Sequence, residues 1–190
     1  MELHKLGIKI FAADAERVDL LALIPVFHRW IQTYALEDLL VDVADYSHVH
    51  AGPGILLVAH EGNYGFDETG SRRGLMYYAK RELPGTLDER LAAVCRKALT
   101  ACRLLEQDAG LQGQVSFRGD EIQLFANDRL AAPNTDETFA GLQPALEALL
   151  ARLYPQGYTL AREADRKERF AVTVKAAEAT DVETLLQRLA

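Results

Sequence analysis

The chain has 190 residues, of which 49% are hydrophobic and 26% charged, and its formal net charge is −7. This composition is typical of a soluble globular domain that buries a core without needing a disulfide or a metal. The acidic balance argues against sequence-independent binding to nucleic acid or to anionic membranes, because both need a basic surface.

The two cysteines, Cys95 and Cys102, fall on the apolar stripe of one predicted helix. They are separated by about 10 Å along the helix axis, which excludes a bridge between them. We therefore interpret them as reduced core thiols. The N-terminus lacks the pattern of a signal peptide, and no apolar run approaches the ~20 residues of a membrane span. A cytoplasmic location is expected.

Strands and helices alternate along the first half of the chain. Period-two alternation or continuous apolar runs indicate the strands, and helical spacing of apolar residues indicates the helices. The sequence Ala51-Gly52-Pro53-Gly54 predicts a turn, and Thr86 is placed to cap the longer helix. The predicted strands are 6–12, 39–49, 55–59 and 75–80, and the predicted helices are 25–35 and 87–105.

The second half repeats this plan. Residues 115–126 predict a hairpin closed on Gly119-Asp120, a favourable two-residue turn. Asn134 and Glu137 form a capping pair for the next helix. A last hairpin at 158–162 and 170–175 precedes a short terminal helix capped by Asp181.

Hairpins that alternate with single helices predict an α+β fold. We expect a largely antiparallel sheet with the helices mainly on one face. The chain is interpreted as a single domain, residues 1–190, and a division into sub-domains 1–110 and 111–190 is compatible with the same pattern.

The histidines suggest the first candidate site. His48, His50 and His60 flank the predicted turn at 51–54. If the loop has those four residues, Asp45 faces His60 on an apolar strand face. Such a carboxylate–imidazole pair, with Glu61 beside it, could supply acid–base catalysis. This register is the one we favour.

A loop of three or five residues would reverse the parity of the hairpin. His48 would then share a face with His60, and His50 with His48 would form a His-x-His pair able to hold a metal ion. Glu61 or Asp67 would complete the ligand set. The spacing matches no specific zinc signature.

A second group of residues suggests ligand binding. Tyr46 belongs to the histidine hairpin, and Asn63 and Tyr64 lie in a polar, glycine-containing segment next to a buried strand, where bulges and ligand contacts are frequent. Arg72 and Arg73 lie in a loop that could hold an anionic ligand.

These features predict a domain that binds a small ligand or a protein partner through strands 42–67, and a homodimer is compatible with this hypothesis. A hydrolase-type enzyme that uses Asp45/His60 or a His48/His50/His60 metal centre is the first alternative. A structural or assembly subunit is the second. No phosphate-binding loop, dinucleotide fingerprint or nucleophile elbow is present in the sequence, and the identity of any cofactor stays open.

Overall fold

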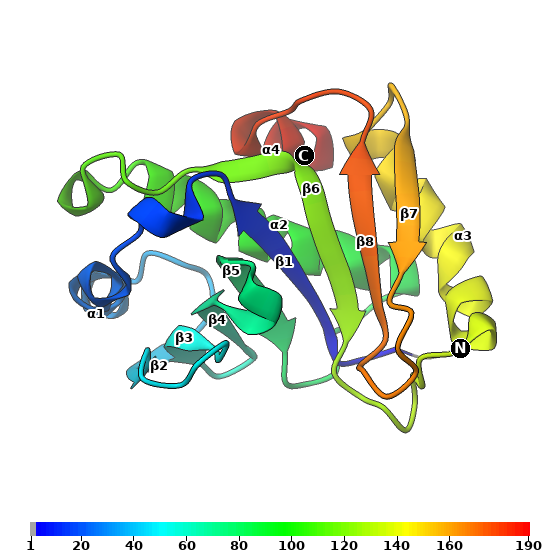
Figure 1. The fold of residues 1–190 in the computed structure, drawn as a ribbon, viewed down its shortest axis with the longest axis horizontal. Coiled ribbons are helices and arrows are strands. Elements are labelled where there is room, and N and C mark those ends of the chain that lie inside the picture. The colour runs from blue at the N-terminus through cyan, green and yellow to red at the C-terminus, as the bar shows by residue number, and fades with distance from the viewer. Residues whose placement is uncertain (1–2) are drawn as a thin grey trace.

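The computed structural model describes residues 3–190 and contains one antiparallel sheet within them. Its strands are β1 Leu6–Ala12, β2 Leu40–Tyr46, β3 Gly54–Ala59, β4 Gly62–Asp67, β5 Gly74–Ala79, β6 Phe117–Ala126, β7 Tyr158–Arg162 and β8 Ala171–Ala176. They lie in the order β2-β3-β4-β5-β1-β6-β8-β7, so the N-terminal strand is internal and joins the two halves of the chain (Figure 1).

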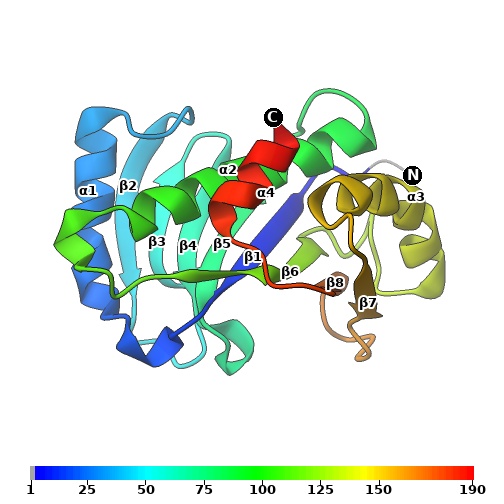
Figure 2. The same ribbon diagram turned by 90° about the horizontal axis from the view of Figure 1, so that it is seen from above.

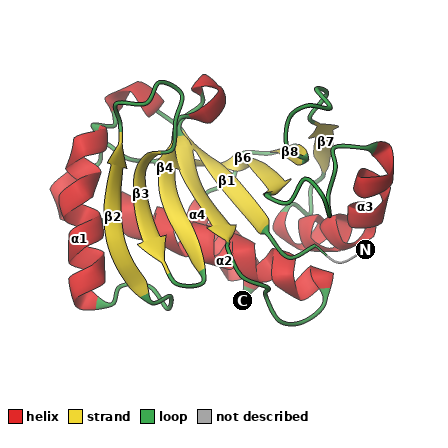
Figure 3. Cartoon of the chain, turned by 90° about the horizontal axis from the view of Figure 1, so that it is seen from below, coloured by secondary structure: helices red, strands yellow, loops and turns green. Residues whose placement is uncertain are grey.

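The helices of the described part are α1 Leu23–Thr33, α2 Leu87–Glu106, α3 Asp136–Leu153 and α4 Val182–Leu189. Helices α2 and α4 cross one face of the sheet, α1 lies beside β2, and α3 lies near β7 (Figure 2). From the opposite side the strands lie in front of α2 and α4 (Figure 3). The predicted α+β class with an antiparallel sheet is confirmed. None of the helices within residues 3–190 has both the length and the apolar composition that crossing a bilayer requires.

Local capping explains where the helices begin. The Thr86 side chain accepts a hydrogen bond from the backbone of Glu89, and the Glu89 carboxylate accepts one from the backbone of Thr86. Asp181 caps α4, as predicted, because its side chain accepts a hydrogen bond from the backbone N–H of Thr184. Helix α3 differs, because Thr135 is its cap rather than Asn134. The Asn134 amide instead donates to the carbonyl groups of residues 163 and 165, and this fixes the loop between β7 and β8.

The two faces of the sheet have different surroundings. Side chains on the helical face join the helices in one continuous core, to which α2 contributes both buried cysteines. On the other face, which we call the open face, Met76, Phe125 and Ala171 form a small separate cluster. The open face therefore has room for polar side chains near the centre of the sheet.

Two segments differ from the predicted elements. Residues 62–67 form a full strand, β4, which pairs with β3 on one side and with β5 on the other. The predicted hairpin at 115–126 is wrong, because β6 continues through Gly119-Asp120 as one strand, with a shift of register against β1 at this point. The backbone carbonyl of Thr180 lies 2.4 Å from the position that a Cβ of residue 119 would take. The glycine at position 119 therefore allows two backbones to lie close together and does not form a turn.

Candidate ligand-binding site

The register of the β2–β3 hairpin separates Asp45 from His60. Asp45 lies opposite Ile55, and the connecting turn comprises residues 47–53. His60 follows the far end of β3, where its backbone N–H donates to the carbonyl of Leu39 at 2.9 Å. The predicted Asp45–His60 pair is therefore wrong. The turn begins early because the Asp45 carboxylate accepts the backbone N–H of Ser47 at 2.8 Å and so ends the strand.

The same register separates His60 from the other two imidazoles. His48 and His50 lie in the turn, and the His48 ring stacks on Tyr46 with centroids 6.4 Å apart. His60 lies at the opposite end of β3, with Nε2 3.7 Å from Glu61 Oε1 and both side chains nearly half exposed. Nowhere in residues 3–190 do three His, Cys, Asp or Glu side chains gather as metal ligands. The predicted His48/His50/His60 centre is not assembled.

Asn63 and Tyr64 are neighbours in β4 and consequently point to opposite faces. The Asn63 amide lies on the open face and donates to the Tyr78 hydroxyl at 2.7 Å. Tyr64 lies among the core residues of the helical face, where its hydroxyl donates to Asp38. These two residues do not share one site.

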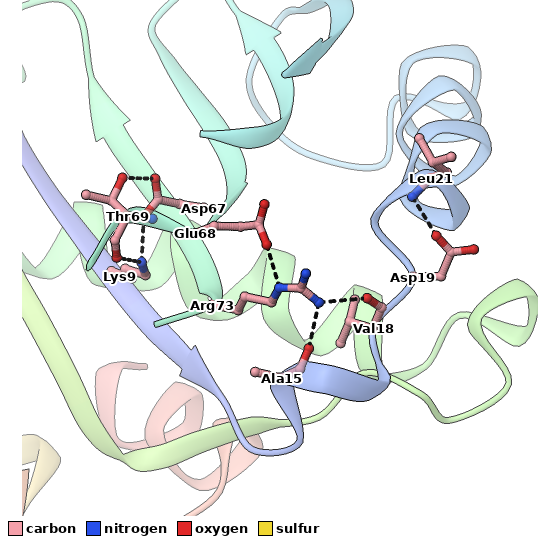
Figure 4. Close-up of polar contacts among 9 residues, drawn as sticks. All are labelled: Lys9, Ala15, Val18, Asp19, Leu21, Asp67, Glu68, Thr69 and Arg73. Atoms are coloured by element: carbon pink, nitrogen blue, oxygen red, sulfur yellow. Dashed lines mark hydrogen bonds and ion pairs between the residues drawn. The ribbon is translucent and has the colours of Figure 1, made fainter. Parts of the chain in front are cut away.

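Arg72 and Arg73 also have different roles. Arg73 Nε donates to Glu68 at 2.6 Å, and its Nη1 donates to the carbonyls of Ala15 and Val18 at 3.0 and 3.2 Å (Figure 4). These contacts attach the loop after β4 to the segment after β1. Arg73 also lines a shallow hollow with His50 at the end of the hairpin. Arg72, by contrast, lies on the open face.

Arg72 lines one side of a cleft of about 500 Å³ on the open face. Strands β1, β6 and β8 form its floor. The loop after β4 lines one side, and the loop between β7 and β8 lines the other. The lining residues are Lys9, Phe11, Thr69, Gly70, Arg72, Gln123, Glu163, Glu168, Arg169, Ala171 and Thr173.

A buried ion pair lies at the floor of this cleft. Lys9 Nζ is 2.5 Å from Asp67 Oδ2, and both side chains are 2% exposed. Lys9 also donates to the carbonyl of Thr69 at 3.2 Å, while Asp67 accepts the backbone N–H and the hydroxyl of Thr69 (Figure 4). Burial lowers the pKa of Lys9. The Asp67 carboxylate opposes that change, and the positive charges of Arg169 and Arg72 add to it.

Two arginines of the cleft lie over aromatic rings. The guanidinium carbon of Arg72 is 3.7 Å from the ring centre of Phe11, and Arg72 Nη2 is 2.8 Å from the buried carboxylate of Glu121. The guanidinium carbon of Arg169 is likewise 3.7 Å from the ring centre of Phe125. Stacking of this kind fixes the plane of a guanidinium group while leaving its N–H edges able to bind an oxyanion.

Gly7 makes the second of these stacks possible. A Cβ at residue 7 would lie 2.3 Å from the Phe125 ring, so the ring lies directly against the backbone of β1. Only glycine leaves this space. The sequence of β1 thus supplies both the lysine of the cleft floor and the position of one aromatic support.

Lys9, Arg169 and the role of Asp67 were not predicted. A signal for Lys9 existed, because one lysine interrupts an otherwise apolar strand whose seven residues are all buried. A buried charge needs a partner, and this implies a carboxylate on a neighbouring strand. Arg169 had no comparable signal, since it lies in a charged loop whose path depends on the tertiary structure.

The helical face holds a second polar cluster. The Asp38 carboxylate is 1% exposed and accepts hydrogen bonds from the Tyr64 hydroxyl and from Lys97 Nζ, the latter at 2.8 Å. A cavity of about 150 Å³ adjoins Tyr64 and Lys97 beneath α2. Burial and the neighbouring Asp38 raise the pKa of Tyr64, so the phenol remains a neutral donor.

Neither protein-family models, nor curated protein sequences, nor solved structures match this chain. The class of protein defined by the fold is an α+β domain with an antiparallel sheet, one face of which is crossed by α2 and α4. The open-face cleft is the candidate site, and its function is inferred from its own chemistry.

Proposed function

We propose that the protein binds a small carboxylate-bearing molecule in the open-face cleft. One observation carries this proposal: two ring-stacked guanidinium groups, from Arg72 and Arg169, line the same cleft as the buried ammonium of Lys9. Guanidinium groups held in a fixed plane recognise carboxylates through paired N–H donors. The sequence predicts an anionic ligand bound by Arg72 and Arg73. The proposal keeps this class of ligand and Arg72, but assigns the second binding arginine to Arg169 instead of Arg73.

The charges around the cleft favour a ligand of low net charge. Three cationic side chains line it, Lys9, Arg72 and Arg169, together with the acidic side chains of Glu163 and Glu168. Lys9 is already paired with Asp67, and Arg72 with Glu121. A polyphosphate would meet nearby carboxylates, whereas a single carboxylate can bind between the arginines. Gln123 and Thr173, which are hydrogen-bonded to each other at 3.3 Å, offer polar contacts for a hydroxyl or carbonyl group.

The test is a titration of the ¹⁵N-labelled protein with lactate, succinate and inorganic phosphate, followed by NMR. We expect both lactate and succinate to shift the amide signals of Gly70 and Thr173. Arg169→Gln should weaken binding about tenfold or more, equivalent to about 1.4 kcal/mol. Arg72→Gln should act in the same direction.

Arg17→Gln is the matched control, because Arg17 is exposed and pairs with Asp14 outside the cleft. It should leave binding unchanged. Binding that survives both cleft variants would contradict the proposed site. If phosphate binds while neither lactate nor succinate does, the proposed ligand class is contradicted.

A further inference from the structure

Among the lysines of residues 3–190, Lys9 is the only one that is buried. It is paired with a carboxylate, and two arginines line the same cleft. Its amine lies at the floor of the open-face cleft rather than on the protein surface. Lys97, which borders the cavity beneath α2, is 22% exposed and pairs with Asp38 on the helical face. Lys175 is 65% exposed. Lys9 therefore differs in burial from the other lysines that the structure describes.

These surroundings match the two physical ways in which a lysine becomes a nucleophile. A lysine is activated by removal from water or by a nearby cation, since both disfavour the charged ammonium form. Burial is the larger effect in lowering the pKa of Lys9, and Arg169 and Arg72 act in the same direction. The Asp67 carboxylate accepts a hydrogen bond from Lys9 Nζ and is therefore placed to receive the proton that the ammonium must lose.

We propose that Lys9 forms a protonated imine with the carbonyl carbon of a small 2-oxo acid whose carboxylate is bound by Arg72 or Arg169. This inference rests on the proposed binding of carboxylates, and it names the substrate class and the reacting atom. A 2-oxo acid presents its carbonyl next to its carboxylate. A ligand anchored by the arginines at the sides of the cleft thus directs its carbonyl toward the lysine at the floor.

The protons balance without a further reactant. The Lys9 ammonium gives one proton to Asp67. The free amine then attacks the carbonyl carbon, so that the C–N bond forms while the C=O π bond breaks and its electron pair moves to oxygen. A second proton passes from nitrogen to the former carbonyl oxygen, giving a carbinolamine. Protonated Asp67 then returns its proton to that hydroxyl group, which leaves as water when the C–O bond breaks. The products are a protonated imine and the Asp67 carboxylate, with the total charge unchanged.

The arrangement also accounts for the burial of the ion pair. An iminium ion carries the same positive charge as the ammonium that it replaces, so Asp67 neutralises the covalent product as well as the free enzyme. The bonds from Thr69 to Asp67 hold the carboxylate in place during the exchange. An iminium group withdraws electrons from the adjacent carbon, which is the basis of lysine-dependent decarboxylation and carbon–carbon bond cleavage.

The test is reductive trapping of the folded protein. The protein is incubated with pyruvate or glyoxylate and cyanoborohydride, digested, and analysed by mass spectrometry. We expect Lys9 to carry the reduced adduct at least tenfold more abundantly than the exposed Lys175 of the same molecule. The rate of trapping at Lys9 should reach half of its maximum below the ordinary pKa of a lysine amine, because burial lowers the pKa of Lys9. Lys9→Arg preserves the positive charge next to Asp67 and should abolish the Lys9 adduct.

The outcomes separate this inference from the proposed function. Lactate has the carboxylate of pyruvate but no carbonyl, so it measures binding alone. Binding of lactate with a Lys9 adduct no greater than that of Lys175 overturns the imine and leaves the binding proposal intact. Absence of lactate binding, with or without adducts, overturns the proposed function. An adduct at Lys9 that Arg72→Gln and Arg169→Gln do not reduce overturns the role given to the arginines.

Discussion

Lys9 and Asp67 are 58 residues apart in the sequence. On the open face, however, Lys9 Nζ lies 2.5 Å from Asp67 Oδ2. The pair connects the N-terminal strand with the end of β4. Because both side chains are almost fully buried, each charge depends on the other for compensation. The pair is therefore important for stability as well as for the proposed chemistry.

Removal of one partner should destabilise the protein strongly. Lys9→Met or Asp67→Leu leaves an uncompensated buried charge, and we expect each to reduce the free energy of unfolding by about 3–5 kcal/mol. The double variant Lys9→Met/Asp67→Leu should cost clearly less than the sum, because no charge remains unpaired. Urea denaturation of the four proteins measures the coupling. Additive losses would show that the two charges do not depend on each other.

The cluster on the helical face should behave differently. Asp38→Ala leaves the buried Tyr64 hydroxyl without its acceptor, and we expect a loss of about 1–3 kcal/mol. Adding Tyr64→Phe to Asp38→Ala removes the unpaired hydroxyl and should restore part of that loss. Urea denaturation again gives the free energies. If Tyr64→Phe deepens the loss instead, the hydroxyl does not depend on Asp38.

Gly119 offers a test of the continuous strand β6. Gly119→Ala should cost about 1–3 kcal/mol, because the new methyl group would meet the backbone carbonyl of Thr180, which cannot move as a side chain can. Gly70→Ala is the matched control, since Gly70 has a φ of +72° but open space around its Cβ position. It should cost only about 1 kcal/mol, from backbone strain alone. Thermal denaturation compares them, and equal losses would contradict the close approach.

The contrast between Thr86 and Gly119 explains how far the sequence predicts this fold. Thr86 and Glu89 form a capping box from residues three positions apart, so local sequence alone determines where α2 begins. Gly119-Asp120 has an equally good local turn pattern. It is overridden because β6 pairs with β1 on one side and with β8 on the other. Such pairing is a tertiary property that no local pattern contains.

The candidate site was less predictable for the same reason. The histidine hypothesis depended on one loop length, and the hydrogen bond from Ser47 to Asp45 moved the turn upstream. Lys9 could have been found as a charge within a buried strand, but its partner could not, because the strand order places β5 between β4 and β1. Asp67 reaches Lys9 from a strand end two positions away in the sheet. Only the three-dimensional arrangement reveals that contact.

Glu106, at the end of α2, should make stability depend on pH. Burial raises the pKa of its carboxyl group above the ordinary value, and the nearby Asp181 adds to this, although the bond from the Phe117 backbone opposes both. The folded state therefore holds the proton more tightly than the unfolded state does. This contribution to stability is present below the unfolded pKa and is lost as pH rises through the folded pKa.

Glu106→Gln removes the titration while preserving an oxygen that can accept the Phe117 N–H. We expect the variant to melt at a higher temperature than the original protein at about pH 7, and this gain should shrink toward about pH 4, where the glutamate is protonated. Glu178→Gln, at an exposed position in the loop before α4, is the control for loss of one negative charge and should produce no comparable change. A gain of the same size at both pH values would mean that removal of the carboxylate acts through something other than its ionisation. A lower melting temperature at neutral pH would show that the charged form stabilises the fold.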